Sequence, residues 1–240
     1  MAQYTLYYWP IPFRGAFVRA ALAHAGASWD EAGFDATLDQ RAADPAQQLV
    51  PHMGPPVLVE HATGLSLSQM PAILIYLGEA HGLLGQDRAQ KALCLKLISD
   101  ANDVLYEMTR YNGAQVWTSE SWAAFQPRLA RWMAIFEQLG LRHGLRREDG
   151  YMLGTEAPNM ADLVVSTLWG TMTDRFPPLR TLLDTHAPAI AGLSDRIAAL
   201  PAQAALIERS RATYGSAWCG GQIEASLRAV LAGDAGGTPG

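Results

Sequence analysis

The chain contains few cysteines and lysines and no run of charges of one sign, and each shortage excludes a class of protein. Its two cysteines, Cys94 and Cys219, lie far apart and form neither a CxxC pair nor a disulfide framework. Lys91 and Lys96 are the only lysines, and the formal net charge is −5. Binding to nucleic acid or to an anionic membrane surface depends on clustered basic residues. We therefore expect neither partner.

Signals for metals, nucleotides and targeting are also missing. No pair of the six histidines stands at i, i+4, and none stands beside a cysteine or carboxylate with ligand spacing, so we expect no metal site. The sequence contains no GxGxxG, GxxxxGK[ST] or GxSxG motif. Residues 1–6 do not resemble a signal peptide, and no apolar stretch reaches the roughly 18 residues of a membrane helix. The expected location is the cytoplasm.

The first eighty residues combine short strands with helices. Residues 5–9 form an aromatic and β-branched run that stops at Pro10, which predicts a buried strand. Apolar residues at helical spacing over 17–25 predict a helix that ends at Gly26, and residues 28–34 predict a second strand. The polar stretch that follows, residues 35–50, is expected to be irregular or weakly helical.

A hairpin and a helix complete this half. Residues 56–60 and 65–67 read as its two strands, and residues 68–80 as the helix that follows. The predicted order is therefore βαβ-α-ββα. We expect this mixed unit to form an α/β domain over residues 1–83.

From about residue 86 onward the pattern is entirely helical. Apolar stripes predict two long amphipathic helices over residues 93–108 and 122–139. Asn159 and Asp162 resemble a capping box, and the apolar run after them predicts a central helix. We expect an all-helical domain over residues 88–232 and a disordered tail over residues 233–240.

Three local motifs, in this order, resemble the soluble glutathione transferases. They are Tyr-Trp-Pro at residues 8–10 with Arg19 in the next helix, Pro-Pro-Val-Leu at residues 55–58, and Asn-Met-Ala-Asp at residues 159–162. The resemblance implies a thioredoxin-like N-terminal domain with a cis-proline, followed by an all-helical domain. It also implies glutathione as co-substrate, a homodimer and a role in detoxification.

Glutathione transfer requires a thiolate near neutral pH, and one hydroxyl can stabilise it. An ordinary cysteine thiol has a pKa of about 8.5, so thiolate at pH 7 needs a shift of roughly two units, or about 2.7 kcal/mol. A hydrogen bond to a charged group contributes about 1.5–3 kcal/mol. Tyr8 is the catalytic candidate and Tyr7 the alternative, because neighbouring strand residues point to opposite faces.

The resemblance also implies a set of glutathione contacts. They are Trp9, Arg14, His52, Pro55, Gln69 and Met70. Two of these depart from the family pattern: Met70 stands where the family has serine, and Pro55 has no N–H to donate to the ligand. Both changes weaken expected glutathione binding and indicate a divergent, bacterial-type class.

The second substrate is expected between the two domains. Its predicted pocket contains Tyr106, Tyr111, Trp169 and Trp218, although aromatic residues at helical spacing also suit a core. The predicted function is conjugation of the glutathione thiolate to small apolar electrophiles, and also reduction of organic hydroperoxides. The alternative is a non-catalytic binding protein for apolar ligands. Disulfide chemistry by the protein itself is disfavoured, because no cysteine precedes Cys94.

Overall fold

The computed structural model describes residues 2–234, and its first part is a four-stranded mixed sheet with three helices. In chain order the elements are β1 (Tyr4–Tyr7), α1 (Phe13–His24), β2 (Trp29–Glu31), α2 (Phe34–Ala42), β3 (Val57–Glu60), β4 (Ser66–Ser68) and α3 (Met70–Ala80). The strand order is β2-β1-β3-β4; β2 runs parallel to β1, while β3 is antiparallel to both β1 and β4. The predicted βαβ-α-ββα order is confirmed.

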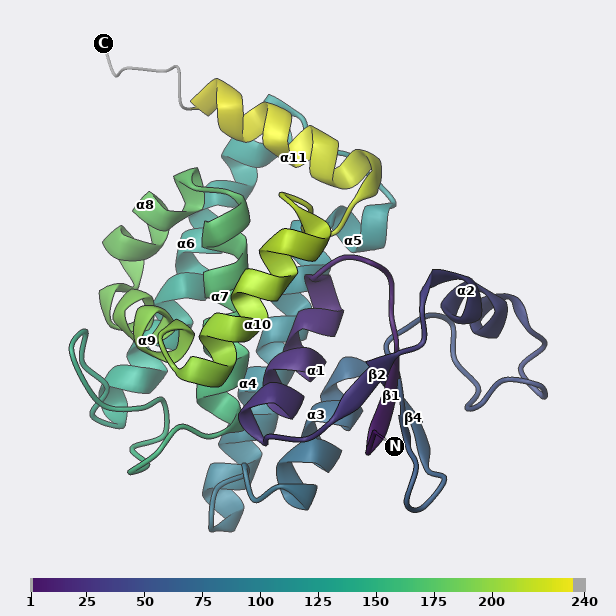
Figure 1. Ribbon diagram of the computed structural model, residues 1–240. Helices are drawn as coiled ribbons and strands as arrows, with labels where there is room; N and C mark the ends of the chain where they lie inside the picture. Colours follow the sequence, from purple (N-terminus) through teal and green to yellow (C-terminus); the bar gives the residue numbers. More distant parts are fainter. Residues whose placement is uncertain (1, 235–240) are drawn as a thin grey trace.

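Side chains along β1 and at Tyr8, which follows it, alternate between the two faces of the sheet. Tyr4, Leu6 and Tyr8 are buried, whereas Thr5 and Tyr7 on the other face are half-buried. Helices α1 and α3 pack against each other and lie between the sheet and the rest of the molecule, and α2 extends on the far side (Figure 1). Tyr8 therefore faces α1 and the centre of the molecule.

Helices make up the rest of the described chain. They are α4 (Arg88–Met108), α5 (Arg110–Gly113), α6 (Ser119–Arg142), α7 (Met160–Arg175), α8 (Pro178–His186), α9 (Pro188–Ala198), α10 (Pro201–Tyr214) and α11 (Gly221–Asp234). The predicted disordered tail covers residues 233–240, but residues 233 and 234 instead form the end of α11, and residues 235–240 lie outside the described residues. None of the helices within residues 2–234 is long and apolar enough to cross a bilayer.

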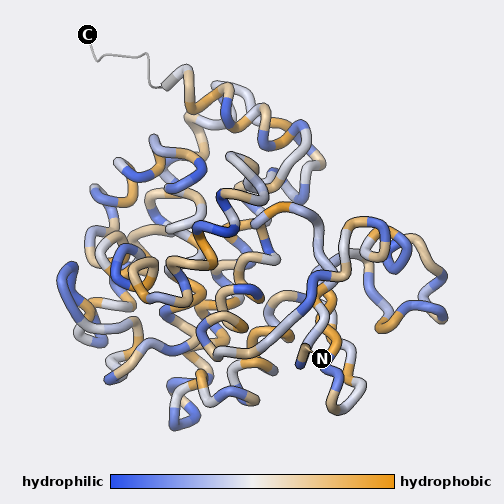
Figure 2. The backbone as a smooth tube through the Cα atoms, in the orientation of Figure 1, coloured by the Kyte–Doolittle hydropathy of each residue, from blue (hydrophilic) through white to orange (hydrophobic). Residues whose placement is uncertain are grey.

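Helix α7 is the central helix, as its apolar sequence predicts. It packs against α9, α4 and α1, and the predicted capping box is present at its start. The carboxylate of Asp162 accepts the N–H of Asn159 at 2.9 Å and also that of Met152 at 2.7 Å. Hydrophobic colour follows the interior elements in Figure 2, while the charged loop after α6 is hydrophilic.

Two predicted boundaries change for local reasons. β2 is shorter than predicted, because Gly33 has φ 86° and turns the chain into α2. The stretch predicted as irregular or weakly helical thus begins with a regular helix. The Pro55–Pro56 peptide bond is cis, as the family resemblance implies.

Candidate active site

Tyr8 follows β1, with its hydroxyl at the start of α1. The hydroxyl oxygen accepts the backbone N–H of Arg14 at 2.9 Å, and only 4% of the residue is exposed. The α1 N-terminus supplies this donor because the first N–H groups of a helix lack helical partners. Within residues 2–234 no acceptor is recorded for the hydroxyl's own proton. The Tyr8 hydroxyl can therefore still donate a hydrogen bond, although the residue is buried.

The electrostatics of Tyr8 favour its protonated form. Burial raises the pKa of Tyr8 to about 12, although the charges of Arg14 and Arg19 and backbone hydrogen bonds oppose the shift. The hydroxyl therefore keeps its proton throughout the neutral range. Gly15 allows this arrangement, because a Cβ at Gly15 would lie 2.3 Å from the Tyr8 ring.

The Arg14 side chain connects the start of α1 to the helices that follow the first domain. Its Nε donates to Oδ1 of Asn102 in α4, and a terminal nitrogen donates to Oδ1 of Asn112 in α5, each at 3.2 Å. Its guanidinium also lies 4.7 Å from the centre of the Phe13 ring. Both amide partners were missed by the sequence analysis, since they lie 88 and 98 residues from Arg14 along the chain.

Helix α5 is a left-handed turn. Arg110, Tyr111 and Asn112 have φ of 47°, 64° and 56°, and Gly113 has 85°. Non-glycine residues rarely adopt this conformation in succession, because Cβ crowds the next carbonyl oxygen. The turn directs Asn112 toward Arg14 and brings the Tyr111 ring within 5.3 Å of the Tyr106 ring.

Tyr106 and Tyr111, two of the four predicted pocket residues, line the same cavity of about 290 Å³. Asn102 and Tyr106 stand four residues apart on α4 and share a face, although neither Asn102 nor Arg14 lines the cavity. Both tyrosines are largely exposed, with 41% and 50% of their surface accessible.

The other two predicted pocket residues lie in the core. Trp169 on α7 is fully buried against Phe136 and does not line this cavity. Trp218 is also buried, with its ring between Phe13 and Phe176 at 5.1 and 5.3 Å. The apolar surface of each ring is satisfied by packing, so the expectation that they face a ligand is corrected.

Gln69 and Met70 begin α3. Gln69 has φ 72° and is exposed, and its side chain caps no N–H group. The side chain of Met70 is directed into the core, and only 1% of the whole residue is exposed. The first N–H groups of a helix lack helical partners and suit an anionic ligand, although Pro71 in the first turn of α3 has no N–H to donate.

The remaining predicted contacts lie on the same side of the sheet as α2 or in the loop before β3. Trp9 packs on Phe34 at 6.0 Å between ring centres. Nδ1 of His52 lies 2.8 Å from the carbonyl oxygen of Val50, which holds the ring in its own loop. Pro55 precedes the cis-proline and is half-buried.

Cys219 lies near the start of α1, although it is distant from α1 in the sequence. The Phe13 N–H donates to the carbonyl of Trp218 at 3.1 Å, which places the segment after α10 beside the start of α1. Cys219 in this segment interacts electrostatically with Arg14, and burial raises the pKa of its thiol to about 12. The thiol is protonated at neutral pH, which makes it a poor nucleophile.

Residues 93–230 match the family model described as glutathione S-transferase, C-terminal domain. Among solved structures, the chain is similar to NaGST-2, at 20% identity and TM-score 0.70, over 87% of this chain and 97% of that one. It is also similar to a Nu-class glutathione S-transferase from Haemonchus contortus, at 19% identity and TM-score 0.68 with the same coverage. No curated protein matches the sequence. The structural similarities establish the fold.

Proposed function

The chain belongs to the glutathione S-transferase family, and from this premise we propose that it conjugates glutathione to small apolar electrophiles, with Tyr8 as the catalytic residue. One observation carries the proposal. The buried Tyr8 hydroxyl accepts the Arg14 N–H at the start of α1 and retains its own proton for a ligand. A hydroxyl polarised in this way stabilises a thiolate more than the corresponding thiol.

The proposed reaction has two steps. The glutathione thiol loses its proton to solvent while the Tyr8 hydroxyl donates a hydrogen bond to the sulfur. The thiolate then attacks the electrophilic carbon, forming a C–S bond and releasing the leaving group with its electron pair. The glutathione backbone is expected at Pro55 and at the α3 start beside Gln69, and the electrophile at the cavity beside Tyr106 and Tyr111.

Tyr8→Phe tests the proposal, and Tyr7→Phe is its matched control on the other face of β1. Losing a hydrogen bond to a charged sulfur costs about 1.5–3 kcal/mol, so kcat/KM should fall by about 10- to 100-fold. The pKa of bound glutathione, measured from thiolate absorbance, should rise by about one to two units in the same variant. Tyr7→Phe should leave both quantities near the wild-type values. A Tyr8→Phe enzyme with wild-type rate and thiol pKa would remove Tyr8 from this role.

Two features favour the alternative, a non-catalytic binding protein for apolar ligands. Pro55 has no N–H for the ligand, and the Met70 side chain is buried instead of presenting a hydroxyl. The same features support our proposal of a divergent, bacterial-type class. Calorimetric titration with glutathione separates the two functions, because the binding protein would show no heat at millimolar glutathione. Turnover of an organic hydroperoxide with glutathione would test the proposed peroxidase activity.

We also propose a homodimer, as is usual in the family. Met53, in the loop before β3, is 90% exposed, and Leu49 in the same loop is 43% exposed. Apolar side chains on an exposed loop are common where a second chain packs. Light scattering would measure the mass, and Met53→Ser should shift the equilibrium toward monomer if this loop contacts the second copy.

A further inference from the structure

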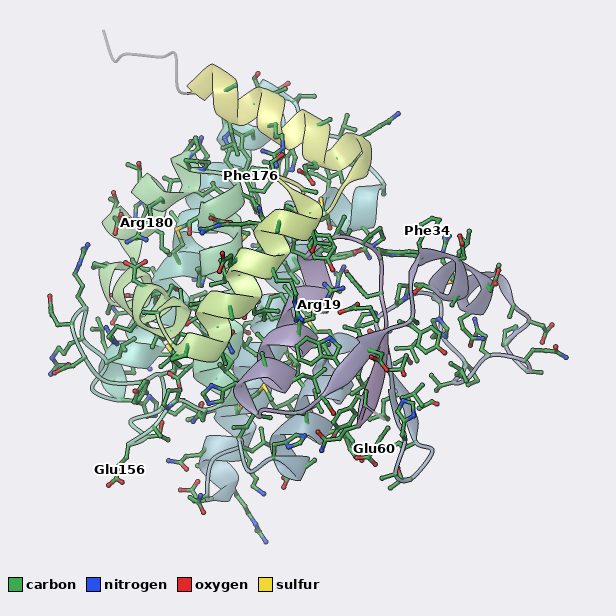
Figure 3. All side chains as sticks on the ribbon, viewed as in Figure 1. Arg19, Phe34, Glu60, Glu156, Phe176 and Arg180 are labelled. Atoms are coloured by element: carbon green, nitrogen blue, oxygen red, sulfur yellow. The ribbon has the colours of Figure 1, made fainter. Side chains whose placement is uncertain are left out.

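The guanidinium of Arg14 is a half-buried cation without a carboxylate partner within residues 2–234. The two arginines that are buried more deeply each have such a partner. Arg19, labelled in Figure 3, pairs with Glu31 at 2.8 Å, and Arg175 lies 3.5 Å from Asp174. Burial lowers the pKa of Arg14, as expected for a cation that has lost water without gaining an anion. The Arg14 charge is therefore available to an anion that binds beside it.

Two amide side chains hold the Arg14 guanidinium instead. Its Nε donates to Oδ1 of Asn102 in α4, and a terminal nitrogen donates to Oδ1 of Asn112 in α5, which lies beside the start of α1 (Figure 1), each at 3.2 Å. An amide oxygen accepts a hydrogen bond without the charge of a carboxylate. No acceptor within residues 2–234 is recorded for the second terminal nitrogen, and that nitrogen is accessible to solvent. The amides thus fix the guanidinium and leave its charge to a ligand.

Carboxylates stand close to Asn102 along α4, but they have other partners. Asp100 and Glu107, within five residues of Asn102 on the same helix, pair with other basic side chains. A carboxylate in place of either amide would form an ion pair with the guanidinium and cancel most of its charge. The neutrality of both acceptors therefore distinguishes this arrangement from an ordinary buried ion pair.

The titratable groups that face Arg14 are uncharged at neutral pH. Within residues 2–234 they are Tyr8, after β1, and Cys219, in the segment after α10, while α4 and α5 face Arg14 with the two amides. Burial raises the pKa of Tyr8 and that of Cys219 to about 12, so both keep their protons. The backbone N–H of Arg14 also donates to the Tyr8 hydroxyl at 2.9 Å. The charge of Arg14 thus has no competing anion beside the proposed catalytic hydroxyl.

The backbone conformation of Asn112 suits few residue types. Its φ is 56°, and it is the third consecutive non-glycine residue at positive φ in α5. Asparagine and aspartate tolerate this region better than other side chains do. Strained backbone persists where surrounding contacts determine it, and it clusters at functional sites. Asn112→Asp therefore keeps the conformation, the size and the acceptor atom, and changes the charge.

We propose that Asn102 and Asn112 are positioning residues in glutathione transfer, which hold the Arg14 guanidinium through uncharged hydrogen bonds so that its charge stabilises the thiolate at the Tyr8 hydroxyl. The inference rests on the proposed function and adds a second source of stabilisation to it. Tyr8 supplies a hydrogen bond to the sulfur, and Arg14 supplies a positive charge whose effect is larger in a half-buried site than in water. Both amides act through Arg14.

Asn112→Asp tests the proposal on the full chain with glutathione bound. Pairing of the new carboxylate with Arg14 should raise the pKa of the bound thiol by about one unit, measured from thiolate absorbance. At pH 6.5, kcat/KM should fall by up to about tenfold, and the loss should disappear as the pH rises above the thiol pKa of the variant. Because the hydrogen bond to Arg14 is retained, the melting temperature should not fall, which separates the effect from damage to the fold.

Gln115→Glu is the matched control, because it adds the same charge three residues after Asn112 but beside Arg110, to which Gln115 is hydrogen-bonded. Its bound thiol should keep the wild-type pKa, since exposed charges are screened by solvent and salt. Asn112→Gly removes the bond to Arg14 without adding a charge, and it should raise the thiol pKa by less than Asn112→Asp does. Asn102→Asp repeats the test from α4 and should raise the thiol pKa by a similar amount.

The outcomes separate this proposal from the role of Tyr8. A raised thiol pKa in both aspartate variants, with Gln115→Glu unchanged, would support the proposal. If Tyr8→Phe raised the thiol pKa but both aspartate variants kept the wild-type value, the amides would have no positioning role while Tyr8 kept its own. Equal shifts in Asn112→Gly and Asn112→Asp would also overturn the proposal, because charge would then not be the cause. A thiol pKa in the wild-type complex equal to that of free glutathione would contradict the proposed function and this inference together.

Discussion

Glu224 holds the segment between α10 and α11 against the start of α1. One carboxylate oxygen accepts the N–H groups of Trp218, Cys219 and Gly220 at 2.9, 2.9 and 2.6 Å, and the other pairs with Arg228 at 2.6 Å. Burial alone would raise the pKa of Glu224, but the hydrogen bonds from Gly220 and Arg228 outweigh it and hold the pKa below the ordinary value. One ionised side chain therefore binds three consecutive N–H groups of the segment.

This arrangement predicts acid sensitivity. Because the folded pKa is below the unfolded value of about 4.3, the unfolded chain binds the proton first as the pH falls. The contribution of Glu224 to stability is complete above that pH and is lost as the pH falls through the folded pKa. In Glu224→Gln, the melting temperature should fall less between pH 5 and pH 3 than in the wild type.

The exposed Glu148 provides the control, since Glu148→Gln removes a carboxylate with no such contacts. Its pH profile should coincide with that of the wild type. If Glu224→Gln and wild type lost stability in parallel over this range, the carboxylate would have no such role.

Among the elements within residues 2–234, the turn α5 has three consecutive non-glycine residues at positive φ. Asn112 within it has φ 56° and accepts a hydrogen bond from Arg14. Asn112→Gly and Asn112→Ala both remove that bond, but only alanine is penalised at positive φ, by about 1–2 kcal/mol. The alanine variant should therefore have a free energy of unfolding lower than that of the glycine variant by this amount, measured by urea titration. Equal stabilities would mean that residue 112 is not left-handed in solution.

The sequence predicts those elements whose signals are local. The β1 run ends at Pro10, the α3 helix follows its hairpin, and the Asn159 and Asp162 cap begins α7 as expected, because propensity, turns and capping act over a few residues. In α5, Asn112 and Gly113 are of residue types that tolerate positive φ, but the left-handed conformation of Arg110 and Tyr111 has no such local signal. The hydrogen bond from Arg14 to Asn112 joins residues 98 positions apart, so the sequence does not indicate it.

The candidate site, like the fold, was predictable from the sequence only in part. Tyr8 and Arg14 flank one short turn, so a motif could place them together. Trp169 and Trp218 could not be assigned, because a tryptophan on an apolar helix face and one beside a pocket look alike in sequence. Only the packing on Phe136 and between Phe13 and Phe176 places both of them in the core.

At the scale of the whole molecule, one hydrophobic core extends from the sheet to the last helix. Buried residues from Tyr4 in β1 to Leu231 in α11 form a single cluster. Helix α1 is central to it, since it packs on α3 on one side and on α7 and α10 on the other. The buried Gln203 of α10 donates to the carbonyl of Ala20 at 2.9 Å and ties the two parts together.

A shared core of this kind predicts that the two parts unfold together. Leu22 in α1 is fully buried, so Leu22→Ala should lower the free energy of unfolding by about 2–5 kcal/mol. Tryptophan fluorescence reports mainly on the helical part, which holds five of the seven tryptophans: Trp117, Trp122, Trp132, Trp169 and Trp218. Circular dichroism reports on both parts. In urea the two signals should give one coincident transition, and the substitution should move both by the same amount. If the variant shifted circular dichroism while tryptophan fluorescence kept its wild-type midpoint, the helical part would be stable without α1, and the continuous core would not couple the two parts.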